Sequence, residues 1–313
     1  MAVTEHVPRR VEQPVRRWRL RGLPLVIAII CFVGVGVLTY PTAAAWTQQY
    51  FQSQDIRDLS ENLEAVGAAE LRTELAEARA YNAELTGGAE IAANERKPLA
   101  DGESTSPSRY EDLLNADGAG LMARIQIPRI DADLTISHGT SDEVLEEGVG
   151  HLEGTALPVG GDGTHAVLTA HRGLATAELF TRLDEVQVGD TFTISVFGEV
   201  LTYQVRDTQV VAPEDTELLN AVPGEDLVTL VTCTPLGINS HRILVTGERI
   251  LPTPVEQEDA ASRGPEVPRF PWWTLVLAGA LVVLAVYVWW SGLPATRRAR
   301  HARVCDTPGG HVD

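Results

Sequence analysis

One cysteine, one histidine and one arginine have the side chains and the spacing that thiol chemistry needs. Cys233 is the only cysteine between Cys31 and Cys305, and it closes the apolar run TLVTC. Arg242 follows nine residues later, and His171 ends the apolar segment AVLTAH. A histidine or a nearby cation favours the reactive thiolate, and a guanidinium can stabilise an oxyanion. The three residues together predict a cysteine nucleophile with a proton acceptor and an anion partner.

Other interpretations of the same residues stay open. Free cysteine is among the residues most often buried, so an inert thiol is the alternative for Cys233. Arg242 could equally pair with a surface carboxylate, and His165, at the start of the segment that leads to His171, fits a polar strand edge. The sequence has no HExxH and no GxSxG motif, which argues against a metalloprotease and a serine hydrolase. We predict no metal and no cofactor.

Short strands must position the three residues. From residue 110 onward, runs rich in Val, Ile, Thr and Leu are separated by Gly, Pro and Asp. Their alternation of apolar and polar residues predicts half-buried strands of a mostly antiparallel sheet or barrel. If the segments 226–233 and 241–250 pair as a hairpin, Cys233 and Arg242 lie at neighbouring strand ends. The predicted strands cover residues 123–128, 133–137, 165–170, 191–197, 200–211, 226–233 and 241–250, with helical turns at 141–148 and 177–186.

Two uncharged apolar segments flank this region. Residues 23–40 follow six arginines and predict a membrane anchor or a signal peptide. We favour a retained anchor because the run is long, although the small residues of TAAAW leave cleavage open. Residues 270–290 have tryptophans near both ends and four arginines after them, as in a spanning helix. The positive-inside bias predicts a cell-membrane protein with both termini in the cytoplasm and the region between the segments outside the cell.

Charge and composition complete the predicted organisation. The formal net charge of −18 argues against nucleic acid and anionic lipid as partners, because both need basic surface. Residues 46–95 predict one or two amphipathic helices, interrupted at the Gly87-Gly88 pair. We predict a cytoplasmic basic N-terminus (1–22), an anchor (23–40), a helical spacer (41–109), a catalytic domain (110–251), a linker (252–269), a transmembrane helix (270–290) and a cytoplasmic basic tail (291–313).

The segments around the three residues resemble the class C sortases, the pilus-assembling sortases of Gram-positive bacteria. The resemblance lies in the blocks IPRIDADLTISHGTSDEVLEEGVGHLEGTALPVGG, HAVLTAHRGLATAELFTRLDEVQVGDTFTI, GEVLTYQV, VVAPEDTELL and TLVTCTPLGINSHRILVTGER. The second apolar segment also fits class C. A single lysine, Lys97, among 25 basic residues suggests an actinobacterial source.

The resemblance implies a mostly β fold, an eight-stranded sortase β-barrel with short helices, and a transpeptidase activity. It assigns Cys233 as the nucleophile, His171 as the general acid and base, and Arg242 as the residue that orients the substrate and stabilises the oxyanion. The implied reaction cleaves an LPxTG-type sorting signal between Thr and Gly through a thioester, which a lysine of a second pilin resolves. Leu230 and Thr232 are expected to line the substrate pocket.

Two alternatives and one departure accompany the resemblance. The acceptor could be the peptidoglycan precursor lipid II, as for a housekeeping sortase, or the chain could be a catalytically silent membrane scaffold. Class C sortases usually carry a lid with an Asp-Pro-aromatic motif over the cysteine. Here Asp101 precedes Gly102, and no aromatic residue follows before Tyr110. A lid within residues 41–109 is therefore either degenerate or works differently, and we assign no lid anchor.

Overall fold

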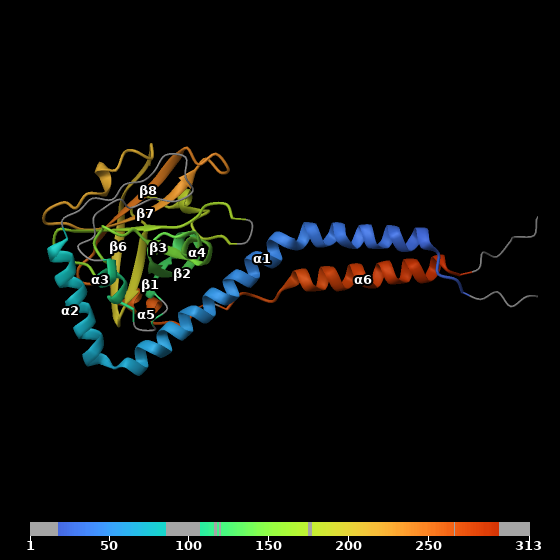
Figure 1. The fold of residues 1–313 in the computed structure, drawn as a ribbon, viewed down its shortest axis with the longest axis horizontal. Helices are drawn as coiled ribbons and strands as arrows, with labels where there is room; N and C mark the ends of the chain where they lie inside the picture. Colours follow the sequence, from blue (N-terminus) through green and yellow to red (C-terminus); the bar gives the residue numbers. More distant parts are fainter. Residues whose placement is uncertain are drawn as a thin grey trace, which may run out of the picture. The chain divides into compact units, whose positions relative to one another are not determined.

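The structure is a computed structural model that describes residues 18–85, 107–115, 118, 120–174, 177–265 and 267–293 (Figure 1). The chain divides into two compact units. Among the described residues, 18–39 and 272–293 belong to the first unit, and those from 40 to 271 belong to the second. The predicted lid stretch around Asp101 and the Gly87-Gly88 pair lie outside the described residues.

The first unit consists of apolar helix. α1 (Gly22–Val66) begins there and continues past Pro41 into the second unit, and α6 (Trp272–Ser291) is its other helix. By length and composition, both helices could cross a membrane. None of the α6 side chains is buried, which suits a helix whose apolar surface meets lipid. These are the two segments in which the sequence predicts an anchor and a transmembrane helix.

A second N-terminal helix packs on the catalytic unit. α2 (Ala68–Glu84) follows α1 after Gly67, whose φ of 91° is a conformation that glycine adopts without strain. The buried Leu75 and Tyr81 of α2 belong to the main hydrophobic core. Asn82 anchors the helix further, because its side-chain amide both donates to the Leu157 carbonyl at 3.0 Å and accepts from the Leu157 amide at 2.7 Å.

Eight strands close into a β-barrel, as the sequence predicts. The neighbour order is β1-β2-β3-β4-β7-β8-β6-β5, and only the β2–β3 and β4–β7 pairs are parallel. The strands are β1 (Leu121–Ile127), β2 (Ala132–His138), β3 (Val149–His151), β4 (Thr164–Thr169), β5 (Thr191–Val196), β6 (Glu199–Val211), β7 (Asp226–Thr234) and β8 (His241–Arg249). The list of predicted strands omits β3, because three residues are too few to show a period of two.

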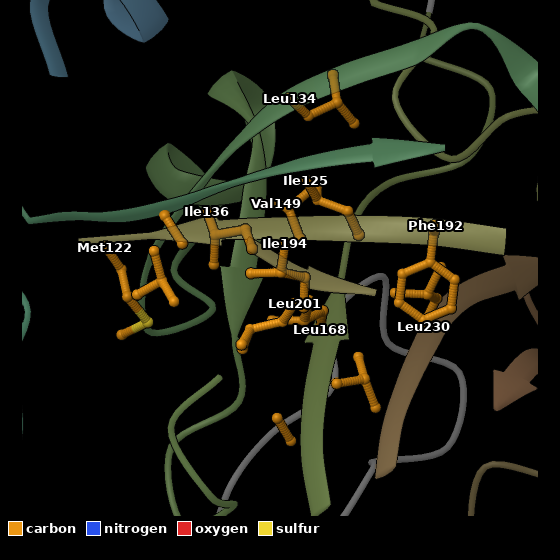
Figure 2. Packing of buried hydrophobic residues seen from close by; sticks show 14 of the residues in the cluster. Met122, Ile125, Leu134, Ile136, Val149, Leu168, Phe192, Ile194, Leu201 and Leu230 are labelled. Carbon is orange, nitrogen blue, oxygen red and sulfur yellow. The ribbon is translucent and has the colours of Figure 1, made fainter. Parts of the chain in front are cut away.

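Buried apolar side chains form two clusters, one inside the barrel and one on its outer face. Side chains that point into the barrel form the main core, and Figure 2 shows Ile125, Phe192, Leu201 and Leu230 among them. A second, smaller group packs on the outer face of β4, β7 and β8. We call it the outer cluster, and it comprises Leu152, Val167, Leu219, Val231 and Leu244.

Short helices connect and cover the strands. They are α3 (Pro107–Asp112), α4 (Asp142–Glu147), α5 (Val255–Ala261) and the 3-10 turns Pro128–Ile130, Leu183–Glu185 and Glu217–Leu219. α4 coincides with the predicted turn at 141–148, and its first turn is capped by Ser141, whose hydroxyl accepts from the Val144 amide. The predicted turn at 177–186 contains only the 3-10 turn, because Leu179 adopts a left-handed φ of 38° that ends any regular helix.

Part of the predicted linker is docked on the barrel. Arg124 of β1 forms a bidentate ion pair with Asp133, with both N–O distances at 2.6 Å. Its Nη1 also donates to the Ala261 carbonyl at 3.2 Å and to the Arg263 carbonyl at 2.9 Å. One buried guanidinium thereby holds the C-terminal end of α5 against β1.

Candidate active site

Cys233 and Arg242 face each other across neighbouring strands. They are direct partners in the antiparallel β7–β8 ladder, and directly opposed side chains in such a ladder have Cβ atoms about 4.5–5.5 Å apart. The predicted hairpin between these two strands is thus confirmed. Its geometry brings the thiol and the guanidinium together at one end of the barrel.

His171 lies two residues past the end of β4, the strand that pairs with β7 on the side away from β8. In the parallel β4–β7 pair, Thr169 lies opposite Val231, and His171 and Cys233 each follow two residues later. The pairing extends past the end of β4, because the Ala170 amide donates to the Val231 carbonyl at 3.2 Å. The register therefore sets His171 beside Cys233.

All three residues lie on the outer face of the barrel. Cys233 shares its side of β7 with Val231, and Arg242 shares its side of β8 with Leu244, and both apolar residues belong to the outer cluster. Side chains two residues apart point to the same face of a strand. A candidate nucleophile, a base and a cation thus meet on three adjacent strands beside an apolar patch.

The surroundings of the three residues are largely dry. Cys233 is 5% exposed, His171 7% and Arg242 0%. The Nη1 of Arg242 donates to the carbonyls of Asn239 at 2.8 Å and His241 at 3.1 Å, which fixes the guanidinium from the β7–β8 loop. Charges so shielded from water interact more strongly than at an exposed surface, which favours an anion or an oxyanion here.

Comparisons with known proteins decide the family. The Sortase domain family matches residues 125–250. The crystal structure of sortase C-1 from Actinomyces oris is 48% identical, with a TM-score of 0.52, and the match covers 57% of this chain and 98% of that one. A Streptococcus pneumoniae sortase C structure is 40% identical, with a TM-score of 0.55, over 64% of this chain and all of that one. The chain belongs to the sortase family.

The curated sortases give a more partial match. Sortase D of Bacillus subtilis is 30% identical over 129 residues, which are 40% of this chain and 62% of that protein. Sortase A of Streptococcus agalactiae is 30% identical over 127 residues, or 51% of its length. This sortase thus spans between half and two thirds of these relatives. The solved class C structures share more with it, and the class C resemblance is confirmed.

The two residues expected to line the substrate pocket point elsewhere. Leu230 is fully buried in the main core inside the barrel (Figure 2). Thr232 is 1% exposed and donates its hydroxyl proton to the Ala170 carbonyl at 2.8 Å. Both side chains point to the face of β7 opposite to that of Cys233, because they lie an odd number of residues from it. Their role in substrate binding stays a prediction, and we leave them out of the surface proposed below.

A small cavity opens on the outer face. It has a volume of about 170 Å³, and its lining includes Leu218, Val222 and Leu244. His165 lies in its wall and is buried, whereas the sequence suggests a polar strand edge. Its Nδ1 donates to the Asn220 carbonyl at 2.9 Å, and burial lowers the pKa of its imidazole. His165 thus fastens the loop between β6 and β7 to the outer face in its neutral form.

A larger cavity of about 400 Å³ lies at the far end of β7. Its lining includes Asp226, the first residue of β7, and Arg249. Strands rise about 3.3 Å per residue, so the seven steps from Asp226 to Cys233 separate this cavity from the thiol by roughly 23 Å. The larger cavity therefore does not belong to the site around Cys233.

A buried hydroxyl–imidazole network lies two strands from Cys233, and no sequence motif predicts it. The Tyr110 hydroxyl of α3 donates to His151 Nδ1 at 2.9 Å and accepts from the Gly139 amide at 3.0 Å. His151 Nε2 donates to the Ala156 carbonyl at 2.8 Å. Burial lowers the pKa of His151 to about 4, so this imidazole is neutral at physiological pH and anchors α3 to the barrel.

Proposed function

We propose that this sortase is a membrane-anchored cysteine transpeptidase that cleaves an LPxTG-type sorting signal and joins the released carboxyl group to a pilin lysine. The main support is the meeting of Cys233, Arg242 and His171 on one face at one end of three neighbouring strands. The solved sortase C chains are matched almost completely at 40–48% identity. For the S. pneumoniae enzyme, pilin substrate specificity is described.

The first step forms a thioester. The Cys233 thiolate attacks the carbonyl carbon of the signal's Thr, and the electron pair of the C=O bond moves onto oxygen. Arg242, which backbone carbonyls already hold in place, stabilises that oxyanion without reorganising. The C–N bond to Gly then breaks, and His171 gives the leaving amine its proton. A thioester remains on Cys233.

The second step resolves the thioester. The ε-amine of a pilin lysine attacks the same carbonyl carbon, and His171 takes the proton that the amine loses. The new C–N bond is an isopeptide bond, and the C–S bond breaks to release the Cys233 thiolate. Bonds and charges balance without a cofactor, because one amide is exchanged for another.

The sorting signal of the substrate is expected to lie across the outer face of the barrel. The small cavity lies on the same face of the sheet as Cys233 and Arg242, and its lining includes Leu244, two residues along β8 from Arg242, together with the charged Arg206, Asp207 and Glu217. Leu218 and Val222, from the loop between β6 and β7, are 43% and 37% exposed and line this cavity. Exposed apolar side chains around a small cavity suit the apolar residues of a sorting signal.

The location proposed for the enzyme is the cell membrane, with the barrel outside the cell and both termini in the cytoplasm. α1 and α6 supply two apolar spans, and the arginines beside each apolar segment favour cytoplasmic ends. This places Cys233 on the side where surface proteins are assembled.

A reconstitution experiment tests the proposal. The full chain in detergent is incubated with a pilin that carries an LPxTG-type tail, beside Cys233→Ala and an Arg109→Gln control that removes an exposed ion pair with Glu84. We expect a ladder that resists reduction with the wild type and the control only. Mass spectrometry should find the Thr carboxyl joined to a pilin lysine.

The other outcomes discriminate between the acceptors. A thioester adduct without a ladder, which added lipid II converts into a peptide-linked product, would replace the pilin lysine by a cell-wall acceptor. A ladder of equal strength with Cys233→Ala would contradict the assigned nucleophile. No adduct and no ladder with any substrate would favour the silent scaffold.

A further inference from the structure

One arginine connects the two strand ends that carry His171 and Cys233. Arg172 follows His171 directly, and its Nη1 donates to the Thr234 hydroxyl at 2.9 Å. Thr234 is the residue after Cys233 and the last residue of β7. The residue after the candidate base thus binds the residue after the candidate nucleophile.

The remaining nitrogens of Arg172 are held as well. Nε donates to the Thr181 carbonyl at 3.1 Å, and Nη2 forms an ion pair with Asp184 at 2.7 Å. The Arg172 side chain is only 10% exposed, whereas Asp184 is 52% exposed. A nearly buried guanidinium with three directed contacts is rigid, because its planar fork fixes the angles between its partners. We call Arg172, Thr181, Asp184 and Thr234 the strand-end bridge.

The loop after His171 closes onto the same place. The Phe180 amide donates to the His171 carbonyl at 3.2 Å, and the Gly173 amide donates to the Thr181 hydroxyl at 3.0 Å. The backbone on both sides of Arg172 is therefore tied to the segment 180–181, which in turn contacts Arg172. β4 itself ends at Thr169, so sheet pairing alone supports His171 only through Ala170.

We propose that Arg172 is a positioning residue that holds His171 at the distance and angle from Cys233 required for proton transfer. Arg172 and Thr234 each follow directly after His171 and Cys233, and successive side chains of an extended chain point to opposite faces. Arg172 therefore acts from the face opposite to the one that carries His171 and Cys233. It touches neither the substrate nor the reacting atoms. The inference rests on the proposed thiol chemistry and adds the residue that keeps its two partners aligned.

Kinetics with the full chain in detergent and a sorting-signal peptide test this role. Arg172→Gln is expected to lower kcat about 10- to 100-fold with KM within about twofold, because small misplacements of reacting groups cost up to about 100-fold. Arg172→Lys keeps the charge but cannot form the three-way fork, so most of the loss should remain. Arg182→Gln, which breaks the more exposed ion pair with Glu185, is the matched control and should stay within twofold of wild type.

A double-variant cycle tests the bridge itself. Thr234→Val removes the hydroxyl that accepts from Arg172 while keeping the side-chain shape. If the two residues act through their contact, the double variant should be no slower than Arg172→Gln alone. If the losses of kcat in the two single variants multiply in the double variant, the two residues act independently and the proposed bridge is contradicted.

A substrate-free measurement separates positioning from stability. The rate at which a small haloacetamide alkylates Cys233 is followed against pH, together with thermal unfolding. Loss of the imidazolium beside a thiolate makes the thiolate harder to form. We therefore expect the profile of Arg172→Gln to move to higher pH and that of Arg182→Gln to stay in place. A lower unfolding temperature with unchanged kcat and an unchanged profile would overturn the proposal.

The two proposals fail in different ways. If the wild type forms no adduct with any sorting peptide, the transpeptidase function fails. The alkylation profile still shows whether Arg172 aligns His171 with Cys233. If the wild type is active and the Arg172 variants match it in kcat and profile, only the positioning role is lost.

Discussion

Arg242 illustrates how single residues make this site. Its side chain is fully buried, and two backbone carbonyls accept hydrogen bonds from its Nη1. Burying a guanidinium costs several kcal/mol unless it is paired, so the fold carries this cost at the position opposite Cys233. An arginine fixed before substrate arrives stabilises developing charge without having to move.

Replacing Arg242 by lysine should show this preorganisation. The ammonium cannot reach both carbonyls and the substrate oxygen at once, so thioester formation should slow by about 100- to 1,000-fold, the usual effect of losing one oxyanion donor. Single-turnover kinetics with a sorting-signal peptide measure the rate. The Arg109→Gln control should leave it unchanged. A loss confined to KM would mean that Arg242 only binds the ground state.

The buried His151 should make the free energy of unfolding depend on pH. Burial lowers its folded pKa from 6.5 to about 4, so the unfolded chain binds more protons in this interval. Stability should therefore fall as pH drops from about 6.5 towards 4, by about 3 kcal/mol at most from this residue. Urea unfolding at several pH values measures it. A His151→Gln variant, even if less stable, should lose this part of the slope.

At the scale of elements, the sequence predicted the strands better than their long-range pairing. The hairpin of β7 and β8 could be predicted, because two runs rich in Val, Leu, Ile and Thr are separated only by the short segment TPLGINS, which contains Pro and Gly. The proximity of His171 to Cys233 could not, because it depends on parallel pairing of β4 with β7, which are far apart in the chain. The strand-end bridge depends on the same pairing, so an ordinary His-Arg dipeptide gave no sign of it.

Gly247 shows how tightly β8 fits the barrel. A Cβ atom there would lie 2.6 Å from the Phe192 ring and 3.0 Å from the Tyr203 Cβ. Gly247→Ala should therefore cost about 1–3 kcal/mol of unfolding free energy, as overpacking usually does. Denaturant unfolding measures it against Gly264→Ala, where no atom lies within 4 Å. Equal stability of the two variants would mean that the ring moves aside freely.

At the scale of the whole molecule, the C-terminal attachment extends the folded barrel beyond its last strand. Arg124 binds the carbonyls of Ala261 and Arg263. A fragment 40–264 should therefore be more stable than a fragment 40–252 by about 1–3 kcal/mol, because the shorter one leaves a buried guanidinium with fewer partners. Chemical denaturation of both measures it. Arg124→Gln should shrink the difference, and an unchanged difference would contradict the role of this arginine.

Because the barrel is closed, every strand has two neighbours, although the second half of β6, beyond Gln204, pairs with β8 alone. Around Cys233, β7 pairs with β4 on one side and with β8 on the other, so a peptide ligand cannot bind there as an extra strand, which is how many domains capture extended peptides of varied sequence. Recognition must instead come from side chains on the outer face and from loop backbone. Recognition of this kind depends on the identity of a few side chains and tolerates little substitution among them, which is the selectivity that the proposed cleavage of one short sorting signal requires.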